Sequence, residues 1–319
     1  MEQEEINEFC NKMTLIRQCV GRIIVGQDKA VELLLTSMIA GGHVLIEGVP
    51  GVAKTLLARL VSKLVDTRFG RVQFTPDLMP SDVLGTTVFN MKTGEFDFHK
   101  GPVFTDIVLA DEINRAPAKT QAALFEVMEE RQVTIDGTSH LMSPVFTILA
   151  TQNPVEQEGT YKLPEAQLDR FLMKITMDYP SIEEETEILR RHQNNSEFSL
   201  LADVKPIITK KELQQMRELV GKIFVEDSLL KYIASIIHQT RESKAVFLGA
   251  SPRAAVATLQ SAKAYALVQG RTFVTPEDIK FVMPSILQHR ILLNAEAEME
   301  GYTTLKVAQR LIDKIEVPK

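Results

Sequence analysis

The residues that most clearly could carry out chemistry lie in one short glycine-rich segment. This segment follows an apolar run and precedes a helix-forming run. In order, its residues are Gly48, Val49, Pro50, Gly51, Val52, Ala53, Lys54 and Thr55. The succession of patterns predicts a strand, a loop and a helix. In such a loop, backbone N–H groups face a phosphate chain, a lysine neutralises the β- and γ-phosphates, and a hydroxyl ligates Mg²⁺. We therefore expect nucleotide binding by this segment and Leu56, with Lys54 and Thr55 in the last two roles.

A second segment supplies the carboxylates that such a site needs. Four apolar residues at 107–110 predict a buried parallel strand, and Asp111 and Glu112 follow at its C-terminal end. Ligands of open α/β sheets bind at that edge. We expect Asp111 to hold Mg²⁺ through its water shell, and Glu112 to polarise a water for attack on the γ-phosphate.

Each segment alone has a simpler interpretation. Ala53 stands where a second glycine is usual, so the first segment is also compatible with a chance glycine turn. The second is also compatible with a strand that ends in an acidic turn. The presence of both, in this order and within one domain, favours nucleotide hydrolysis.

The elements that must position these residues alternate along the first half of the chain. Strands are predicted at 43–47, 71–74, 107–110, 145–149 and 171–177. Helical patterns lie between them, as in a doubly wound parallel sheet. Two longer connections, at 84–102 and 132–137, predict β-hairpins, the second with an Asp-Gly turn. Before the sheet, residues 6–40 have a helical pattern that the glycines of 20–27 interrupt.

After Pro180 the pattern changes to a series of helices. Ser181 with Glu184, and Thr209 with Glu212, fit capping boxes. Two further helices are predicted to begin where a hydroxyl residue precedes a proline, at 251–252 and 275–276. We therefore predict an αβα nucleotide-binding domain with an N-terminal helical segment over 1–180, and a smaller all-helical domain over 181–319.

Composition limits the classes of function. The chain has 319 residues, 45% of them hydrophobic, and a formal net charge of −6, with basic clusters no longer than pairs. This charge pattern disfavours nucleic acid as the main ligand. The N-terminus lacks the features of a signal peptide, and no apolar stretch is long enough to span a bilayer, so we expect a cytoplasmic protein. Cys10 and Cys19 are expected to be reduced thiols.

With these elements in place, the chain resembles the MoxR family of AAA+ ATPases over nearly its whole length. The glycine-rich segment has the family's form, with alanine at 53, and residues 111–116 match the acidic motif and its continuation. The strand that ends before Asn153 resembles the first sensor, which implies that Asn153 holds the attacking water; a plain Asn-Pro turn is the alternative. The resemblance also implies ATP and Mg²⁺ as ligands, and an adenine pocket lined by Val25, Gly26 and Gln27.

Two arginines acquire expected roles through the same resemblance. Residues 163–171 resemble the segment that carries an arginine finger, and Arg170 is the residue expected to reach the γ-phosphate of a neighbouring subunit. An intrachain ion pair with Asp169 or Glu165 is the alternative. Residues 249–254 resemble the second sensor, and Arg253 is expected to bind the γ-phosphate and close the lid over it. Its place in the first turn of a helix opposes the helix dipole, which also indicates an anionic partner.

The resemblance implies a fold and a function. The fold is an AAA+ P-loop nucleoside triphosphatase domain, with a five-stranded parallel sheet between helices and β-hairpin inserts, followed by an all-α lid. The function is that of a chaperone-like ATPase motor, a hexameric ring that remodels or matures protein partners, among them proteins with a von Willebrand factor A domain. The exposed hairpin residues Phe96 and Phe98 either contact substrate or pack on the strand face.

Three alternatives stay open at this stage. A metal-chelatase motor subunit shares the hairpin inserts. A slow nucleotide-gated scaffold is disfavoured by the intact Glu112 and Asn153. A DNA-directed motor is disfavoured by the acidic balance of charge.

Overall fold

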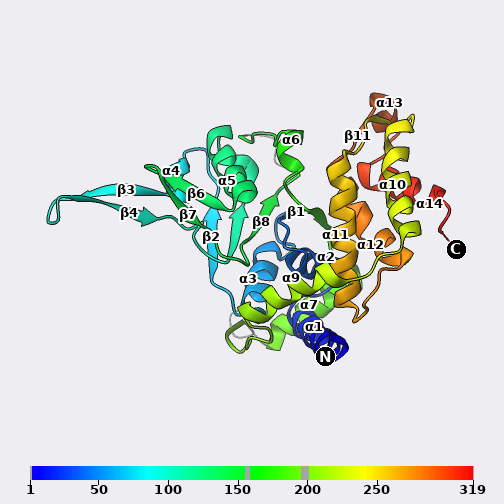
Figure 1. The fold of residues 1–319 in the computed structure, drawn as a ribbon, viewed down its shortest axis with the longest axis horizontal. Coiled ribbons are helices and arrows are strands. Elements are labelled where there is room, and N and C mark those ends of the chain that lie inside the picture. Colours follow the sequence, from blue (N-terminus) through cyan, green and yellow to red (C-terminus); the bar gives the residue numbers. More distant parts are fainter. Residues whose placement is uncertain (1, 155–158, 195–200, 319) are drawn as a thin grey trace.

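The computed structural model describes residues 2–154, 159–194 and 201–318, and its centre is a five-stranded parallel sheet (Figure 1). The strand order is β2-β5-β8-β1-β9. The strands are β1 (Val44–Gly48), β2 (Phe69–Gln73), β5 (Ile107–Asp111), β8 (Thr147–Gln152) and β9 (Met173–Met177). All five predicted strands are present, with ends shifted by at most a few residues.

The register of the strands decides which residues meet at the edge of the sheet. Val44 of β1 pairs with Leu149 of β8 and with Met173 of β9, and Gln73 of β2 pairs with Asp111 of β5. All five residues of β5 are buried, as expected for a strand covered on both faces. Because the strands are parallel and aligned, the glycine-rich loop, the two carboxylates and the residue after β8 all follow strand ends at one edge.

Helices cover the two faces of this sheet, and alternate side chains of β1 point to opposite layers. Val44 and Ile46 belong to one hydrophobic cluster, and Leu45 belongs to the other. The first layer contains α1 (Glu2–Ile23), α2 (Asp28–Ile39) and α3 (Lys54–Leu64), and the second contains α5 (Ala118–Glu130). The predicted break at 20–27 is shorter than expected, because α1 continues through Gly21 to Ile23.

Both predicted hairpins are confirmed, and they contact each other through their side chains. They are β3 (Gly85–Asn90) with β4 (Glu95–Lys100), after α4 (Pro80–Leu84), and β6 (Gln132–Ile135) with β7 (Thr138–Leu141). The first hairpin extends well beyond the body of the domain (Figure 1). Phe98 packs on His140 of the second hairpin, with ring centroids 4.6 Å apart, so its packing is that of a strand-face aromatic. Phe96 is exposed and packs on Phe89.

The rest of the chain forms a helical lid. Its helices are α7 (Ile182–Asn194), α9 (Lys210–Lys222), α10 (Asp227–Glu242), α11 (Pro252–Val268), α12 (Pro276–Leu287), α13 (Ala295–Met299) and α14 (Thr304–Lys314). One feature was not predicted, a short antiparallel pair of β10 (Val246–Leu248) and β11 (Leu292–Leu293). The capping boxes at Ser181, Thr209 and Thr275 are formed, whereas Ser251 makes no side-chain cap bond.

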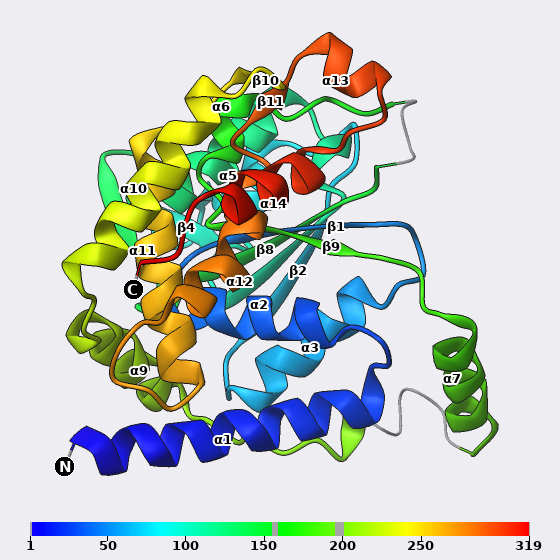
Figure 2. The ribbon, with the colours of Figure 1, turned by 90° about the vertical axis from the view of Figure 1, so that its right-hand side faces the viewer.

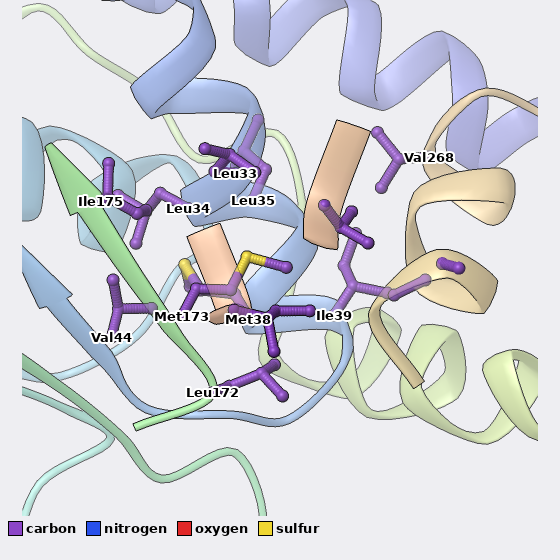
Figure 3. Close-up of a cluster of buried hydrophobic side chains, with 14 of the residues drawn as sticks. Leu33, Leu34, Leu35, Met38, Ile39, Val44, Leu172, Met173, Ile175 and Val268 are labelled. Carbon is purple, nitrogen blue, oxygen red and sulfur yellow. The ribbon is translucent and has the colours of Figure 1, made fainter. Parts of the chain in front are cut away.

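The lid helices lie at two different places relative to the sheet. α7 stands beyond the ends of β1 and β9, whereas α10 and α11 lie where those strands begin (Figure 2). Val268 of α11 shares a hydrophobic cluster with Ile39 and Met38 of α2 (Figure 3). We propose the domain boundary at Tyr179-Pro180, between the end of β9 and the start of α7. Among the described residues, no helix is long and apolar enough to cross a membrane.

Candidate active site

The glycine-rich loop joins β1 directly to α3. Gly48 is the last residue of β1, and a Cβ there would lie 2.7 Å from the carbonyl oxygen of Met177 on β9, so this position requires glycine. Ala53 adopts a left-handed conformation, with φ of 64° and ψ of 23°, directly before α3. That conformation explains why a glycine is usual at this position, since glycine adopts it without the steric cost that a Cβ imposes. Lys54 begins the helix, and its Nζ donates a hydrogen bond to the Gly48 carbonyl.

The two carboxylates follow β5 at the same edge of the sheet, opposite Thr55. Thr55 Oγ1 lies 3.4 Å from Asp111 Oδ2, while Asp111 Oδ1 accepts a 2.6 Å hydrogen bond from Thr151 of β8. The same threonine oxygen accepts a 2.9 Å bond from the backbone N–H of Glu112. Asn153, buried directly after β8, lines the same cleft. The structure therefore brings together Lys54, Thr55, both carboxylates and Asn153.

Two residues of β2 that sequence reasoning missed complete the polar network. The Arg71 guanidinium donates to Asp111 Oδ2 from Nη2 and Nε, at 2.7 and 3.1 Å, and Nη2 also donates to Gln73 Oε1. Gln73 Nε2 in turn donates to Glu112 Oε2 at 2.7 Å. One chain of hydrogen bonds thus joins both carboxylates. The sequence alone carried no signal for these two residues, because their role depends on the pairing of β2 with β5, which places alternate β2 residues beside the end of β5.

These side chains surround an open cleft of about 480 Å³. It is lined by Pro50, Gly51, Ala53, Lys54, Thr55, Leu56, Arg59, Arg71, Gln73, Asp111, Glu112, Asn153 and Leu201. Donors at the loop and the start of α3 suit phosphate oxygens. The Thr55 hydroxyl and the Asp111 carboxylate are oxygen ligands of the kind that Mg²⁺ prefers, so the residues fit that ion.

A second pocket adjoins the loop on its other side and includes two of the three residues expected at adenine. Val25 and Gln27 line it, together with Ile188, Arg191 and His192 of α7. Gly26 does not line this pocket; it turns the backbone, with φ of 75°, against the side chain of Glu184. Val49 of the glycine-rich loop, which was expected to contact the nucleotide, packs against the hydrophobic cluster of the first layer. The contribution of α7 could not be predicted, because it depends on how the lid folds back.

Arg170 and Arg253 lie together, but away from the cleft that the glycine-rich loop and the two carboxylates line. Both line a separate pocket with Gly42 and His43, the residues that precede β1, so they lie where the strands begin. Arg170 is bonded to Glu129 on α5 and to Gln167 Oε1, rather than to Asp169 or Glu165. Arg253, which is 65% exposed, lies 3.6 Å from Glu129 and 3.9 Å from Asp169.

The structure separates Arg253 from the glycine-rich loop of the same chain. Arg253 was expected to bind the γ-phosphate and close the lid over it, and α11 holds it at the edge of the sheet opposite that loop. The reason is the packing of α11 against α2 and α9, which keeps this part of the lid beside the beginning of β1. Local sequence could not reveal this, because the packing partner of a lid helix is set by tertiary structure.

The fold and the site define a class of protein, an AAA-type ATPase with its lid. Two family profiles match the chain: the ATPase family associated with various cellular activities (AAA) over residues 43–173, and the AAA lid domain over residues 238–315. A crystal structure of a Cytophaga hutchinsonii protein, assigned as an ATPase, has a TM-score of 0.90 and 44% identity, covering 100% of this chain and 98% of that one.

Sequence relatives narrow the class to a family. Chaperone MoxR1 of Mycobacterium tuberculosis is 43% identical over 94% of this chain and 81% of its own length. YeaC of Bacillus subtilis is 42% identical over 99% of this chain and 97% of its own length. The chain belongs to the MoxR family of AAA+ ATPases.

Proposed function

We propose that this chain is a chaperone-type motor that hydrolyses ATP at sites shared between neighbouring subunits of a ring. The observation that carries the proposal is the separation of the site residues into two groups. The phosphate loop, carboxylates and Asn153 line one cleft, and Arg170 and Arg253 lie together at the opposite edge of the sheet. A head-to-tail contact between copies brings the second group of one subunit to the first group of the next, and such contacts generate rings when the rotation closes.

In this mechanism the residues of one chain bind and orient the nucleotide. The backbone of the loop and Lys54 neutralise the phosphates, and the pocket beside Val25 and Gln27 takes the adenine. Thr55 and Asp111 would hold Mg²⁺, which would supply further positive charge beside the phosphate oxygens. Glu112 accepts the proton of the attacking water, which Asn153 orients in line with the γ-phosphate.

The neighbouring chain supplies the remaining positive charge. Arg170 and Arg253 would stabilise the charge that develops on the γ-phosphoryl group, since a guanidinium is planar and always ionised. Both would lose this ligand after hydrolysis, so each turnover changes the contact between subunits. A hexamer is the proposed assembly, on the family resemblance.

Protein partners would be engaged by the projecting hairpin of β3 and β4. Its exposed apolar residues Val88, Phe89, Met91 and Phe96 give it a surface for protein contact. The name of the MoxR1 relative, a chaperone, supports remodelling of proteins over metal chelation. Partners with a von Willebrand factor A domain, a cytoplasmic location and the absence of a nucleic-acid ligand stay predictions.

The test is ATP turnover per chain as a function of protein concentration, with Mg²⁺ present. Turnover per chain should rise with concentration, because each site needs residues of two chains. Arg170→Ala should bind ATP normally and show little turnover at any concentration. Turnover that is independent of concentration, or undiminished in Arg170→Ala, would contradict a shared site; tight ATP binding with negligible turnover in the wild type would favour the scaffold alternative.

A further inference from the structure

The turn that carries Arg170 is held by one buried arginine of the lid. Arg290 follows α12 and is 4% exposed. Its Nε donates a 2.6 Å hydrogen bond to Asp169 Oδ1, next to Arg170 in the chain. Its Nη2 donates to the carbonyl of Phe171 at 2.7 Å, and its Nη1 to that of Leu172 at 3.0 Å. One guanidinium thus binds the residue before Arg170 and the two residues after it.

The two residues before Arg290 extend the same attachment along β9. His289, buried, donates from Nε2 to the Phe171 carbonyl at 3.0 Å. Gln288 donates to the Lys174 carbonyl and accepts a 3.3 Å bond from Thr176. A short lid segment, residues 288–290, therefore runs beside residues 169–176 and is bonded to them at several points.

The attachment is more extensive than a surface ion pair. Arg290 is buried among carbonyl groups, and burial lowers its pKa although Asp169 opposes this effect. A buried guanidinium without its partners would be costly, so the loss of one partner should weaken the whole attachment. Lysine cannot replace arginine here, because one ammonium lacks the planar fork that reaches a carboxylate and two carbonyls at once.

We propose that Arg290, paired with Asp169, is a positioning residue for Arg170. The lid of one subunit would then fix the position of the arginine that contacts the nucleotide of the neighbouring subunit. The inference rests on the proposed function, because it requires Arg170 to act across a subunit contact. A movement of the lid that shifts residues 288–290 would then shift Arg170 as well. Displacements of about 1 Å at a catalytic group can lower the rate about a hundredfold.

The first measurement compares Arg290→Lys and Asp169→Asn with the wild type. Each variant should bind ATP with unchanged affinity, while turnover at saturating ATP falls by about tenfold or more. The control is Arg271→Lys, because Arg271 is another lid arginine in a two-point pair with a buried aspartate, Asp278, away from Arg170. Wild-type turnover in the Arg290 and Asp169 variants, or an equal loss in the control, would overturn the inference.

The second measurement uses mixed rings, which distinguish positioning of Arg170 from general damage. Glu112→Gln should not hydrolyse ATP but keeps Arg170 and the turn around it intact. Arg290→Lys has the opposite defect, because its phosphate loop and carboxylates are intact. A mixture of the two should recover turnover that neither shows alone, as should Arg170→Ala mixed with Glu112→Gln. Asp169→Asn provides the same test if Arg290→Lys fails to fold, which thermal denaturation reports.

The two mixtures separate the two proposals. Recovery in both supports the positioning role. Recovery with Arg170→Ala but not with the Arg290 or Asp169 variants overturns that role and leaves the shared site intact. Failure of the Arg170→Ala mixture contradicts the shared site itself, and the positioning role falls with it.

Discussion

At the scale of single residues, Asp111 forms an ion pair with Arg71. The ion pair measures 2.7 Å, and the Arg71 side chain is 41% exposed. The oxygen that Arg71 binds, Oδ2, is also the one that faces Thr55. With Mg²⁺ held by Thr55 and Asp111 as proposed, Arg71 would compete with the ion or its water shell for the same carboxylate oxygen.

Removal of Arg71 should lower the Mg²⁺ concentration that ATP binding requires. A half-exposed pair contributes less than about 1 kcal/mol, so the half-saturating Mg²⁺ concentration of Arg71→Ala should fall by about two- to fivefold. The measurement is the affinity for a fluorescent ATP analogue at a series of Mg²⁺ concentrations. Arg59→Ala, which removes another arginine of the cleft, is the matched control. Weaker nucleotide binding at every Mg²⁺ concentration would instead identify Arg71 as a phosphate contact.

At the scale of elements, Asp106 ties the start of β5 to the start of α9. Its side chain is 2% exposed, and it accepts hydrogen bonds from Lys210 Nζ at 2.5 Å and from the Arg68 backbone at 2.9 Å. Burial alone would raise its pKa, but the bonds from Lys210, Ser143 and Arg68 lower the pKa to about 2. This carboxylate therefore joins the sheet to the lid through its charged form.

The depressed pKa predicts how stability depends on pH. Because the pKa is lower in the folded than in the unfolded chain, the stabilisation is present above about pH 4 and is lost as the pH falls toward 2. Asp106→Asn should lower the free energy of unfolding by about 2 kcal/mol at pH 7. Urea denaturation from pH 7 to pH 3 is the measurement, and the difference from the wild type should shrink at the acid end. Asp203→Asn, at an exposed position, is the control; a constant difference across this range would refute the assignment.

Elements also show where sequence reasoning succeeds and where it ends. The strands, both hairpins and the capped helices have local signals, such as the Asp136-Gly137 turn, whose two residues both adopt positive φ. Arg71 gave no signal, because an arginine in a half-exposed strand is ordinary until its neighbour is known. The pair of β10 and β11 is too short for a detectable pattern. The position of Arg253 depends on which helices α11 packs against, which no local window contains.

At the scale of the whole molecule, the proposed shared site would make assembly depend on nucleotide. In the single chain, Glu129 binds Arg170 and lies 3.6 Å from Arg253. In the proposed shared site, the phosphates of ATP in the neighbouring cleft would have to displace this carboxylate. Since the γ-phosphate is the group that the arginines bind, ATP should favour the contact between subunits more than ADP does.

Glu112→Gln makes this expectation measurable, because it should keep ATP bound without hydrolysis. With Mg²⁺ and ATP, its light-scattering mass should reach that of the ring at a lower protein concentration than with ADP or without nucleotide. Combining it with Arg170→Ala should abolish the difference between ATP and ADP, whereas combining it with Arg271→Lys should retain that difference. If Glu112→Gln assembles at the same protein concentration with ATP as with ADP, the arginines do not bind the γ-phosphate of the neighbouring subunit.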